Sequence, residues 1–167
     1  SEEAEPKFKS IYGLSKITAE NYVKSYNQKY KMKYNIIRYF NVYGEDQRQD
    51  FVISKFTKNI KKNKNLTIYG KGNQIRIFCN VEDAAEGTLE IIKRAKVNNV
   101  YNVGNNLEPI SIKNLAKKMI KMSKKKIKID MVDFKDSDRS KDREIYKRIP
   151  NISKIIKDTK YKPKKTL

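Results

Sequence analysis

The sequence of 167 residues contains no histidine and a single cysteine, Cys79. Without histidine, Ser-His-Asp and Cys-His catalysis are excluded, and a typical zinc site is not expected. Any acid–base catalysis must therefore use Tyr, Lys, Asp or Glu side chains. One cysteine also excludes a disulfide framework.

Long apolar segments are missing as well. No run of about 18 apolar residues is present, so no membrane-spanning helix is expected. The N-terminal stretch SEEAEPKFKS has no apolar core like that of a signal peptide. Together with the single cysteine, this predicts a cytoplasmic protein. A glycine-rich phosphate loop is also absent, because the glycines of YGKGNQ open no predicted helix.

Positive charge, in contrast, is abundant. The net charge is +20, which at first suggests a nucleic-acid partner. Lys supplies 32 of the 39 basic residues and Arg only 7, whereas specific nucleic-acid surfaces rely on Arg. We therefore interpret most lysines as solvated surface and regard nucleic acid as an unlikely partner. A basic nucleic-acid-binding module remains an alternative function.

The chain alternates between two hydrophobic patterns. Helical spacing of apolar residues predicts helices, and clusters of β-branched and aromatic residues predict strands. The expected helices span residues 15–30, 51–62, 82–95, 111–126 and 151–162, and the expected strands span 34–40, 66–70, 75–81, 99–104 and 127–133. Ser111 is a predicted helix cap, and Ala85, Leu89 and Ile92 share one side of their helix. The alternation predicts an α/β fold, with a charged loop at 134–148 as the nearest candidate linker.

A possible catalytic pair stands near the start of the chain. Tyr12 and Lys16 lie four residues apart, so they share one helix face. An ammonium group favours the phenolate form of a neighbouring tyrosine. Such a tyrosine can exchange a proton with a sugar hydroxyl or a keto oxygen while hydride moves to or from a nicotinamide. However, about two such pairs are expected by chance among 11 Tyr, and Tyr161 and Lys165 form a second. The spacing alone therefore does not identify a site.

Further motifs follow in a fixed order: YGLSK, RYFNVYGEDQ, YGKGNQIRIFCNVEDAA, VYNVGNN, ISIKNLAKKM, DRSKDREIYKRIPNISKI and KYKP. This ordered set resembles the C-terminal half of the extended short-chain dehydrogenase/reductase family, the NAD-dependent nucleotide-sugar epimerases and dehydratases. The resemblance extends over essentially the whole chain.

The resemblance implies the C-terminal part of a doubly wound, Rossmann-like parallel sheet plus a smaller α/β substrate-binding region. Residues 1–50 would end the dinucleotide-binding domain with the catalytic helix, and residues 51–167 would form mostly the substrate-binding region, interleaved with the last sheet strands. The glycine-rich loop and a catalytic Ser/Thr would lie upstream, so we expect this fragment alone to be inactive. The full-length enzyme would use NAD or NADP, act on a nucleotide sugar and form a homodimer. A non-catalytic remnant of the same fold is another alternative.

The resemblance also assigns roles near the cofactor. Tyr12 would be the catalytic acid/base, and Lys16 would favour its phenolate form and hold the nicotinamide ribose. Tyr39, Phe40 and Asn41 would lie beside the nicotinamide and the substrate, although Tyr39 and Phe40 could equally be core residues. Asn41 would contact the substrate diphosphate, in keeping with its place at the carboxyl end of a strand.

Arginines would bind the substrate, because a planar guanidinium matches diphosphate geometry. By the resemblance, Arg76 reaches the nucleotide part, although an ordinary exposed strand residue is the alternative. Arg139 would be the second diphosphate-binding arginine, with Arg143 and Arg148 as rivals. For Asp83, at a helix start, we expect capping or pairing with the helix dipole and no substrate contact.

The sequence departs from the family pattern at a few positions. Glu45 stands where a proline usually follows NVYG, and Ile77 and Asn80 replace an acidic and an aromatic residue of the RDF-Y-V motif. These changes leave the sugar unspecified.

Overall fold

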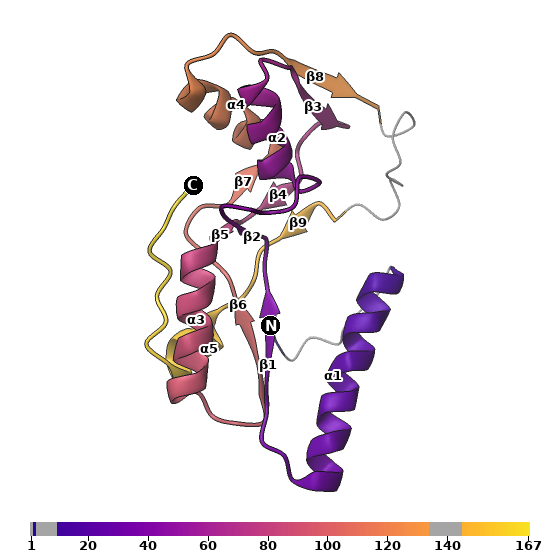
Figure 1. The fold of residues 1–167 in the computed structure, drawn as a ribbon, viewed down its shortest axis with the longest axis vertical. Helices are drawn as coiled ribbons and strands as arrows, with labels where there is room; N and C mark the ends of the chain where they lie inside the picture. The colour runs from indigo at the N-terminus through magenta and orange to yellow at the C-terminus, as the bar shows by residue number, and fades with distance from the viewer. Residues whose placement is uncertain (1, 3–9, 134–144) are drawn as a thin grey trace.

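The computed structural model describes residues 2, 10–133 and 145–167. Its helices are α1 (Ile11–Tyr30), α2 (Val52–Lys61), α3 (Val81–Arg94), α4 (Ile112–Ser123) and α5 (Ser153–Asp158). Its strands are β1 (Asn35–Tyr39), β2 (Val42–Tyr43), β3 (Leu66–Tyr69), β4 (Ile75–Arg76), β5 (Cys79–Asn80), β6 (Asn99–Val103), β7 (Ile110–Ser111), β8 (Ile129–Val132) and β9 (Lys147–Arg148). Helices and strands alternate, which confirms the predicted α/β class (Figure 1).

Parallel pairing dominates the strands. β1 pairs with β6, β2 with β5, β3 with β8 and β4 with β9, all in parallel. Only β7 runs antiparallel to its partner, β4, among the described strands. Parallel partners need long crossover connections, and α2, α3 and α4 each lie between strands that do not pair with each other.

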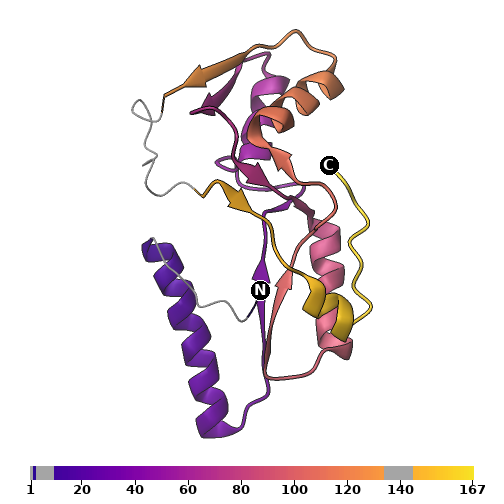
Figure 2. The same cartoon turned by 180° about the vertical axis from the view of Figure 1, so that it is seen from behind.

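The β1–β6 pair has helices on both sides. In Figures 1 and 2, α1 stands on one side of these strands, and α3 and α5 lie on the other. Adjacent residues of β1 reach opposite sides, as strand geometry requires: Arg38 binds Glu20 of α1, and the Tyr39 hydroxyl lies 2.7 Å from the Thr88 hydroxyl of α3. A hydrophobic cluster on the α3 side includes Tyr101 and Tyr161.

A second hydrophobic cluster joins α2 and α4 to β3 and β8. Its buried members include Phe56, Leu66 and Leu115, and Met119 and Ile120 of α4 pack against it. Ser111 caps α4 as predicted, because its hydroxyl accepts a hydrogen bond from the Asn114 amide at 3.1 Å. This second cluster forms one wall of the site described below.

The buried side of α3 corrects the sequence interpretation. Leu89 and Ile92 are 52% and 74% exposed, while Ala84, Gly87 and Ile91 are buried. The reason is close packing, since a Cβ added at Gly87 would lie only 2.9 Å from the Tyr161 ring. Small residues therefore mark the packed side of this helix, and larger apolar residues face outward.

Three predicted segments also differ. The strand expected at 75–81 is two short strands with different partners, because β4 pairs with β7 and β9 while β5 pairs with β2. The last helix ends at Asp158, well before Pro163. Within the predicted charged loop, residues 147–148 form β9, and residues 134–144 lie outside the described part of the chain.

Candidate active site

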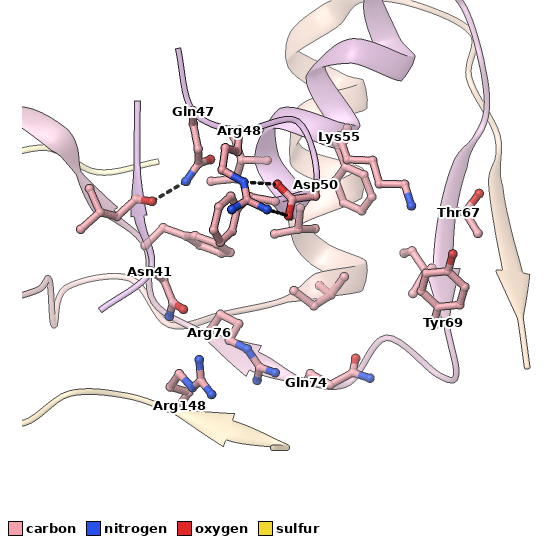
Figure 3. A pocket seen from close by; sticks show the side chains of 18 of the residues that line it. Asn41, Gln47, Arg48, Asp50, Lys55, Thr67, Tyr69, Gln74, Arg76 and Arg148 are labelled. Carbon is pink, nitrogen blue, oxygen red and sulfur yellow. Dashed lines mark hydrogen bonds and ion pairs between the residues drawn. The ribbon is translucent and has the colours of Figure 1, made fainter. Parts of the chain in front are cut away.

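A pocket of about 610 Å³ opens at the carboxyl end of β1 (Figure 3). Its lining includes five residues singled out from the sequence: Tyr12, Tyr39, Asn41, Arg76 and Arg148. They come from α1, from the end of β1, and from β4 and β9, so the fold gathers side chains up to 136 positions apart. Ligands of open α/β sheets lie at this end of the strands.

Asn41, two residues after the end of β1, adopts a left-handed backbone conformation with φ of 44°. Its side-chain amide donates a hydrogen bond to the Ile77 carbonyl at 2.7 Å, and its own carbonyl accepts one from the Cys79 amide at 3.2 Å. Asparagine tolerates this conformation better than most residues. The polar head of Asn41 is thereby held at the pocket wall.

Two arginines enter the pocket from neighbouring strands. Arg76 in β4 and Arg148 in β9 are register partners, and Figure 3 places both side chains at the same end of the pocket. The guanidinium of Arg76 also donates to the Ile75 carbonyl at 3.0 Å. Two adjacent guanidinium groups suit a diphosphate. Arg148 was a rival in the sequence interpretation, and Arg139 and Arg143 lie outside the described residues.

Tyr12 lies in the first turn of α1 and is 71% exposed at the pocket. Ser10 caps this helix through a 3.1 Å hydrogen bond from the Gly13 amide. The ammonium of Lys16 lies 5.3 Å from the centre of the Tyr12 ring, so the two side chains are neighbours as their spacing predicts. Lys16 is not among the residues that line the pocket.

Tyr39 and Phe40 have different surroundings. Tyr39 is 53% exposed and lines the pocket, so it is not a core residue. Phe40 is half-buried, packs near Gly104 and does not line the pocket.

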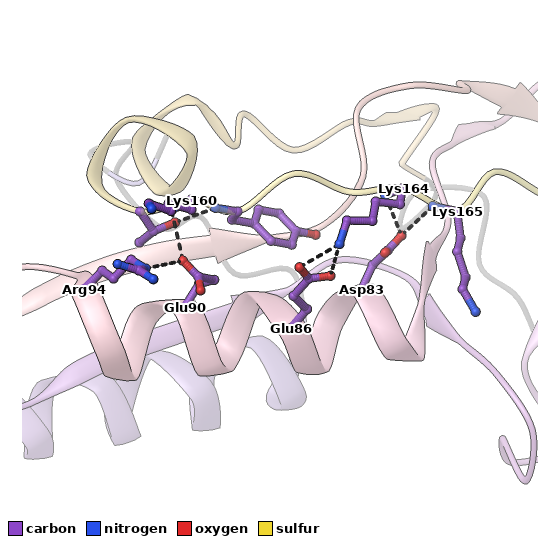
Figure 4. Close-up of polar contacts among 9 residues, drawn as sticks. Asp83, Glu86, Glu90, Arg94, Lys160, Lys164 and Lys165 are labelled. Atoms are coloured by element: carbon purple, nitrogen blue, oxygen red, sulfur yellow. Dashed lines mark hydrogen bonds and ion pairs between the residues drawn. The ribbon is translucent and has the colours of Figure 1, made fainter.

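Asp83 does not cap α3, but it lies in the first turn of this helix, where pairing with the helix dipole was the other expectation. Asn80 is the residue that caps α3, through a 2.9 Å hydrogen bond from the Glu82 amide. Asp83 is buried in the first turn and accepts hydrogen bonds from the backbone amides of Lys164 and Lys165 at 3.2 and 2.9 Å. As Figure 4 shows, it holds the C-terminal segment along α3.

The second Tyr-x-x-x-Lys pair is structural. Tyr161 is 2% exposed, and its hydroxyl donates to the Gly104 carbonyl at 2.7 Å. Burial, with the neighbouring Cys79, raises the pKa of Tyr161 far above its usual range. Lys165 forms an ion pair with Glu82 instead of approaching the Tyr161 hydroxyl.

Several lining residues were missed in the sequence. The loop after β2 contributes Gln47, Arg48 and Asp50, and the Arg48 guanidinium, 2.7 Å away, lowers the pKa of Asp50. Lys55 and Gln74 line the pocket from α2 and from the turn before β4. The polar run GEDQRQD after the NVYG motif was the available signal for the loop.

Two further properties bound the chemistry. Within residues 2, 10–133 and 145–167, no group of three or more His, Cys, Asp or Glu side chains could hold a metal ion. None of the helices in these ranges has both the length and the apolar character needed to cross a membrane.

Several known proteins with similar sequences are nucleotide-sugar enzymes by name. Residues 1–104 match the sequence model of the NAD dependent epimerase/dehydratase family. Human dTDP-D-glucose 4,6-dehydratase is 39% identical over 113 residues, covering 68% of this chain and 32% of that protein. A putative UDP-glucose 4-epimerase of Methanocaldococcus jannaschii is 43% identical over 104 residues, covering 59% of this chain and 33% of that protein.

Almost all of this chain has the same fold as part of a solved structure. UDP-glucuronic acid 4-epimerase from Bacillus cereus, in complex with UDP-glucuronic acid and NAD, superposes with a TM-score of 0.89 at 29% identity. The match covers 99% of this chain and 51% of that chain, and it confirms the predicted Rossmann-like fold class. This chain thus spans about a third of the length of the two sequence relatives and about half of the solved structure.

Proposed function

Because this chain belongs to the NAD dependent epimerase/dehydratase family, we propose that it is the C-terminal part of an enzyme that binds a nucleotide sugar and transfers a hydride at the sugar. The observation that carries this proposal is one pocket lined by Tyr12, Asn41, Arg76 and Arg148. A proton-transfer group and a diphosphate-binding set are the two elements that such a reaction needs from this part of the chain.

The substrate diphosphate would lie against Arg76 and Arg148, with the amide of Asn41 as a further donor. The two strands place these guanidinium groups side by side in the register of β4 and β9. Diphosphate carries more than one negative charge, and charge-assisted hydrogen bonds from arginine are stronger than neutral ones. The sugar would then lie toward Tyr12, which lines the same pocket.

Tyr12 would move the proton. Its ring is exposed at the pocket, and the Lys16 ammonium lies 5.3 Å from the centre of that ring. The two side chains therefore offer a hydroxyl and a cation to the ribose of a nicotinamide nucleotide. NAD, when bound, supplies the hydride acceptor. Tyr12 would take the proton from the sugar hydroxyl, and Lys16 would hold the nicotinamide ribose.

We also propose that the two parts of the chain bind different molecules. Residues 1–50, with α1 and β1, would complete a dinucleotide-binding domain, and residues 51–167 would mostly bind the substrate. The last sheet strands would be interleaved with the substrate-binding region, since the hydrophobic cluster around β1 and β6, which is separate from the one around α2 and α4, takes its buried members from residues 79–161. The 167-residue chain alone would bind nucleotide diphosphates without turnover, because it contains no glycine-rich loop for the cofactor phosphates.

Binding to the 167-residue chain tests the pocket. Calorimetry with UDP-glucuronic acid and dTDP-glucose should detect binding of at least one of them. Arg76→Met and Arg148→Met should each weaken that affinity by about tenfold or more, as expected for a lost charge-assisted hydrogen bond. Arg94→Met is the matched control, because Arg94 lies on α3 and is not among the lining residues. Absence of any nucleotide-sugar binding would overturn the proposal.

Turnover by the complete gene product tests the role of Tyr12. Tyr12→Phe should lower kcat by about 10²–10⁴-fold, the usual contribution of general acid–base catalysis, while the substrate Kd stays within about twofold. Tyr30→Phe, a matched change at the far end of α1, should leave kcat unchanged. Normal kcat in Tyr12→Phe would remove Tyr12 from the mechanism.

A further inference from the structure

Gln74 is a buried amide in the wall of the pocket. The residue is 6% exposed, and it lines the pocket beside Tyr69 and Arg76 (Figure 3). Its side-chain oxygen, Oε1, accepts no hydrogen bond from any residue that the structure describes. Buried side-chain oxygens nearly always have a hydrogen-bond partner, so this oxygen needs an explanation.

The backbone around Gln74 is held in place by the start of α4. The Ile112 amide donates to the Gln74 carbonyl at 3.1 Å, and the Lys113 amide donates to the Gly72 carbonyl at 3.0 Å. Gly72 has a φ of 66°, and a Cβ there would lie 2.9 Å from the Ile68 side chain, so only glycine fits this turn. The turn therefore cannot easily rearrange to bring the Gln74 amide to water.

An unpartnered amide oxygen is unfavourable for folding. Burying a polar group without a partner costs free energy, whereas an apolar side chain of similar size would fill the same space without that cost. Local features that destabilise a protein are concentrated at functional sites, where a ligand supplies the missing interaction. The location of Gln74 in the pocket wall fits a ligand as the missing donor.

The position of Gln74 relative to Arg76 indicates which part of the ligand could donate a hydrogen bond to the Gln74 oxygen. Gln74 comes two residues before Arg76, and both side chains line the same pocket. A diphosphate held by Arg76 would therefore place the nucleoside within reach of Gln74. Its ribose hydroxyls and the N3–H of a uracil or thymine base are neutral donors, which suit an amide oxygen.

We propose that Gln74 is a specificity-determining residue whose Oε1 accepts a hydrogen bond from an O–H or N–H donor of the nucleoside part of the substrate. This inference rests on the proposed function. It predicts that Gln74 contributes to the affinity for a nucleoside diphosphate and contributes nothing to the affinity for pyrophosphate.

The test compares Gln74→Leu with the unaltered 167-residue chain by calorimetry. The ligands are pyrophosphate and whichever of UDP and dTDP the unaltered chain binds more tightly. The nucleoside diphosphate should bind Gln74→Leu about tenfold more weakly, as expected when one hydrogen bond is lost, and pyrophosphate should bind within twofold. Gln28→Leu, the same change on an exposed position of α1, should alter neither affinity.

Two analogues identify the donor. The 2′,3′-dideoxy nucleotide lacks both ribose hydroxyls, and the N3-methyl nucleotide lacks the base N–H. The tenfold difference between the unaltered chain and Gln74→Leu should disappear with one of them, and that analogue names the donor. A difference that persists with both analogues would overturn the inference.

Stability without ligand separates binding from a structural role. Gln74→Leu should raise Tm, because it removes the unpartnered oxygen. A lower Tm together with weaker binding of pyrophosphate would mean that Gln74 supports the fold, and the inference would fail.

The same measurements distinguish failure of this inference from failure of the proposed function. If the unaltered chain binds no nucleoside diphosphate, both the inference and the proposed function fail. If the unaltered chain binds and Gln74→Leu binds equally well, only the role of Gln74 is wrong.

Discussion

Arg38 in β1 and Glu20 in α1 form a two-point ion pair in which both hydrogen bonds are 2.7 Å long. Their side chains are only 24% and 15% exposed. This contact matters for the site because α1 has no buried residue of its own, yet it carries Tyr12 to the pocket. The ion pair is thus a main link between the β1–β6 strands and the helix that presents the proposed acid/base.

Arg38→Met should loosen α1. The change leaves the Glu20 carboxylate without its partner in a poorly exposed position, which should lower the free energy of unfolding by about 2 kcal/mol. Urea unfolding measures the loss, and hydrogen exchange should be faster throughout α1. Lys164→Met removes a well-exposed ion pair with Glu86 and should change little. Unchanged exchange in α1 would mean that other contacts hold the helix.

Two substitutions of Asn41 separate the role of its backbone conformation from the proposed ligand contact of its side chain. Its φ of 44° is unfavourable for alanine and acceptable for glycine, so Asn41→Ala should be less stable than Asn41→Gly by about 1 kcal/mol. Both variants lose the side-chain amide, so both should bind UDP or dTDP more weakly to a similar extent. Urea unfolding and calorimetry on the two variants check this. Normal affinity in Asn41→Gly would exclude a ligand contact by the side chain.

Asp83 should hold the C-terminal segment in place. Asp83→Ala removes the acceptor for the Lys164 and Lys165 amides, so the segment should detach from α3 more often. Trypsin should then cleave after these lysines about tenfold faster, which mass spectrometry can follow. Glu86→Gln, which affects only the exposed pair with the Lys164 side chain, is the control. Equal cleavage rates in both variants would argue against this role.

The thiol of Cys79 should make stability depend on alkaline pH. Burial is the largest cause that raises its pKa, from 9.0 to about 11, and the nearby Asp83 carboxylate adds to the increase. Because the folded-state pKa is the higher one, the stabilising effect of the protonated thiol is complete below about pH 9. It is lost as pH rises from about 9 to about 11.

Urea unfolding between pH 8 and pH 11 checks this directly. Cys79→Ala should be less stable at pH 8, because it leaves a cavity, and should lose less stability than the unaltered chain over this range. Parallel pH profiles for the two proteins would contradict the prediction. As Cys79 is the only cysteine, slow reaction of the native chain with a thiol reagent at pH 8 would independently report its burial.

Local patterns were sufficient to place most secondary structure. The strands at 35–39, 66–69 and 99–103 and the cap at Ser111 follow from side-chain type and spacing over a few residues. The predicted strand at 75–81 failed because β4 and β5 find their partners in distant parts of the chain. The buried side of α3 could not be predicted either, since it depends on contact with Tyr161, 74 positions after Gly87.

Some residues of the candidate site could likewise be predicted from the sequence, and others could not. The ordered motifs were enough to single out Tyr12, Asn41 and Arg76, and all three line the pocket. Among the arginines near the end of the chain they favoured Arg139, with Arg143 and Arg148 as rivals. Arg148 lines the pocket, and the other two lie outside the described residues. Gln74 carried no signal, because an unpartnered oxygen is a property of its surroundings and not of its residue type.

By itself, the sequence determined the available chemistry: without histidine, proton transfer is left to groups such as tyrosine and lysine. The spacing alone did not distinguish the two Tyr-x-x-x-Lys pairs, although the ordered motifs favoured Tyr12. Only the tertiary structure decided their surroundings: Tyr12 is 71% exposed at a pocket, whereas Tyr161 is 2% exposed and lies in the core. The physical reason is that residue type and spacing are local, whereas burial depends on strands and helices that meet from distant parts of the chain.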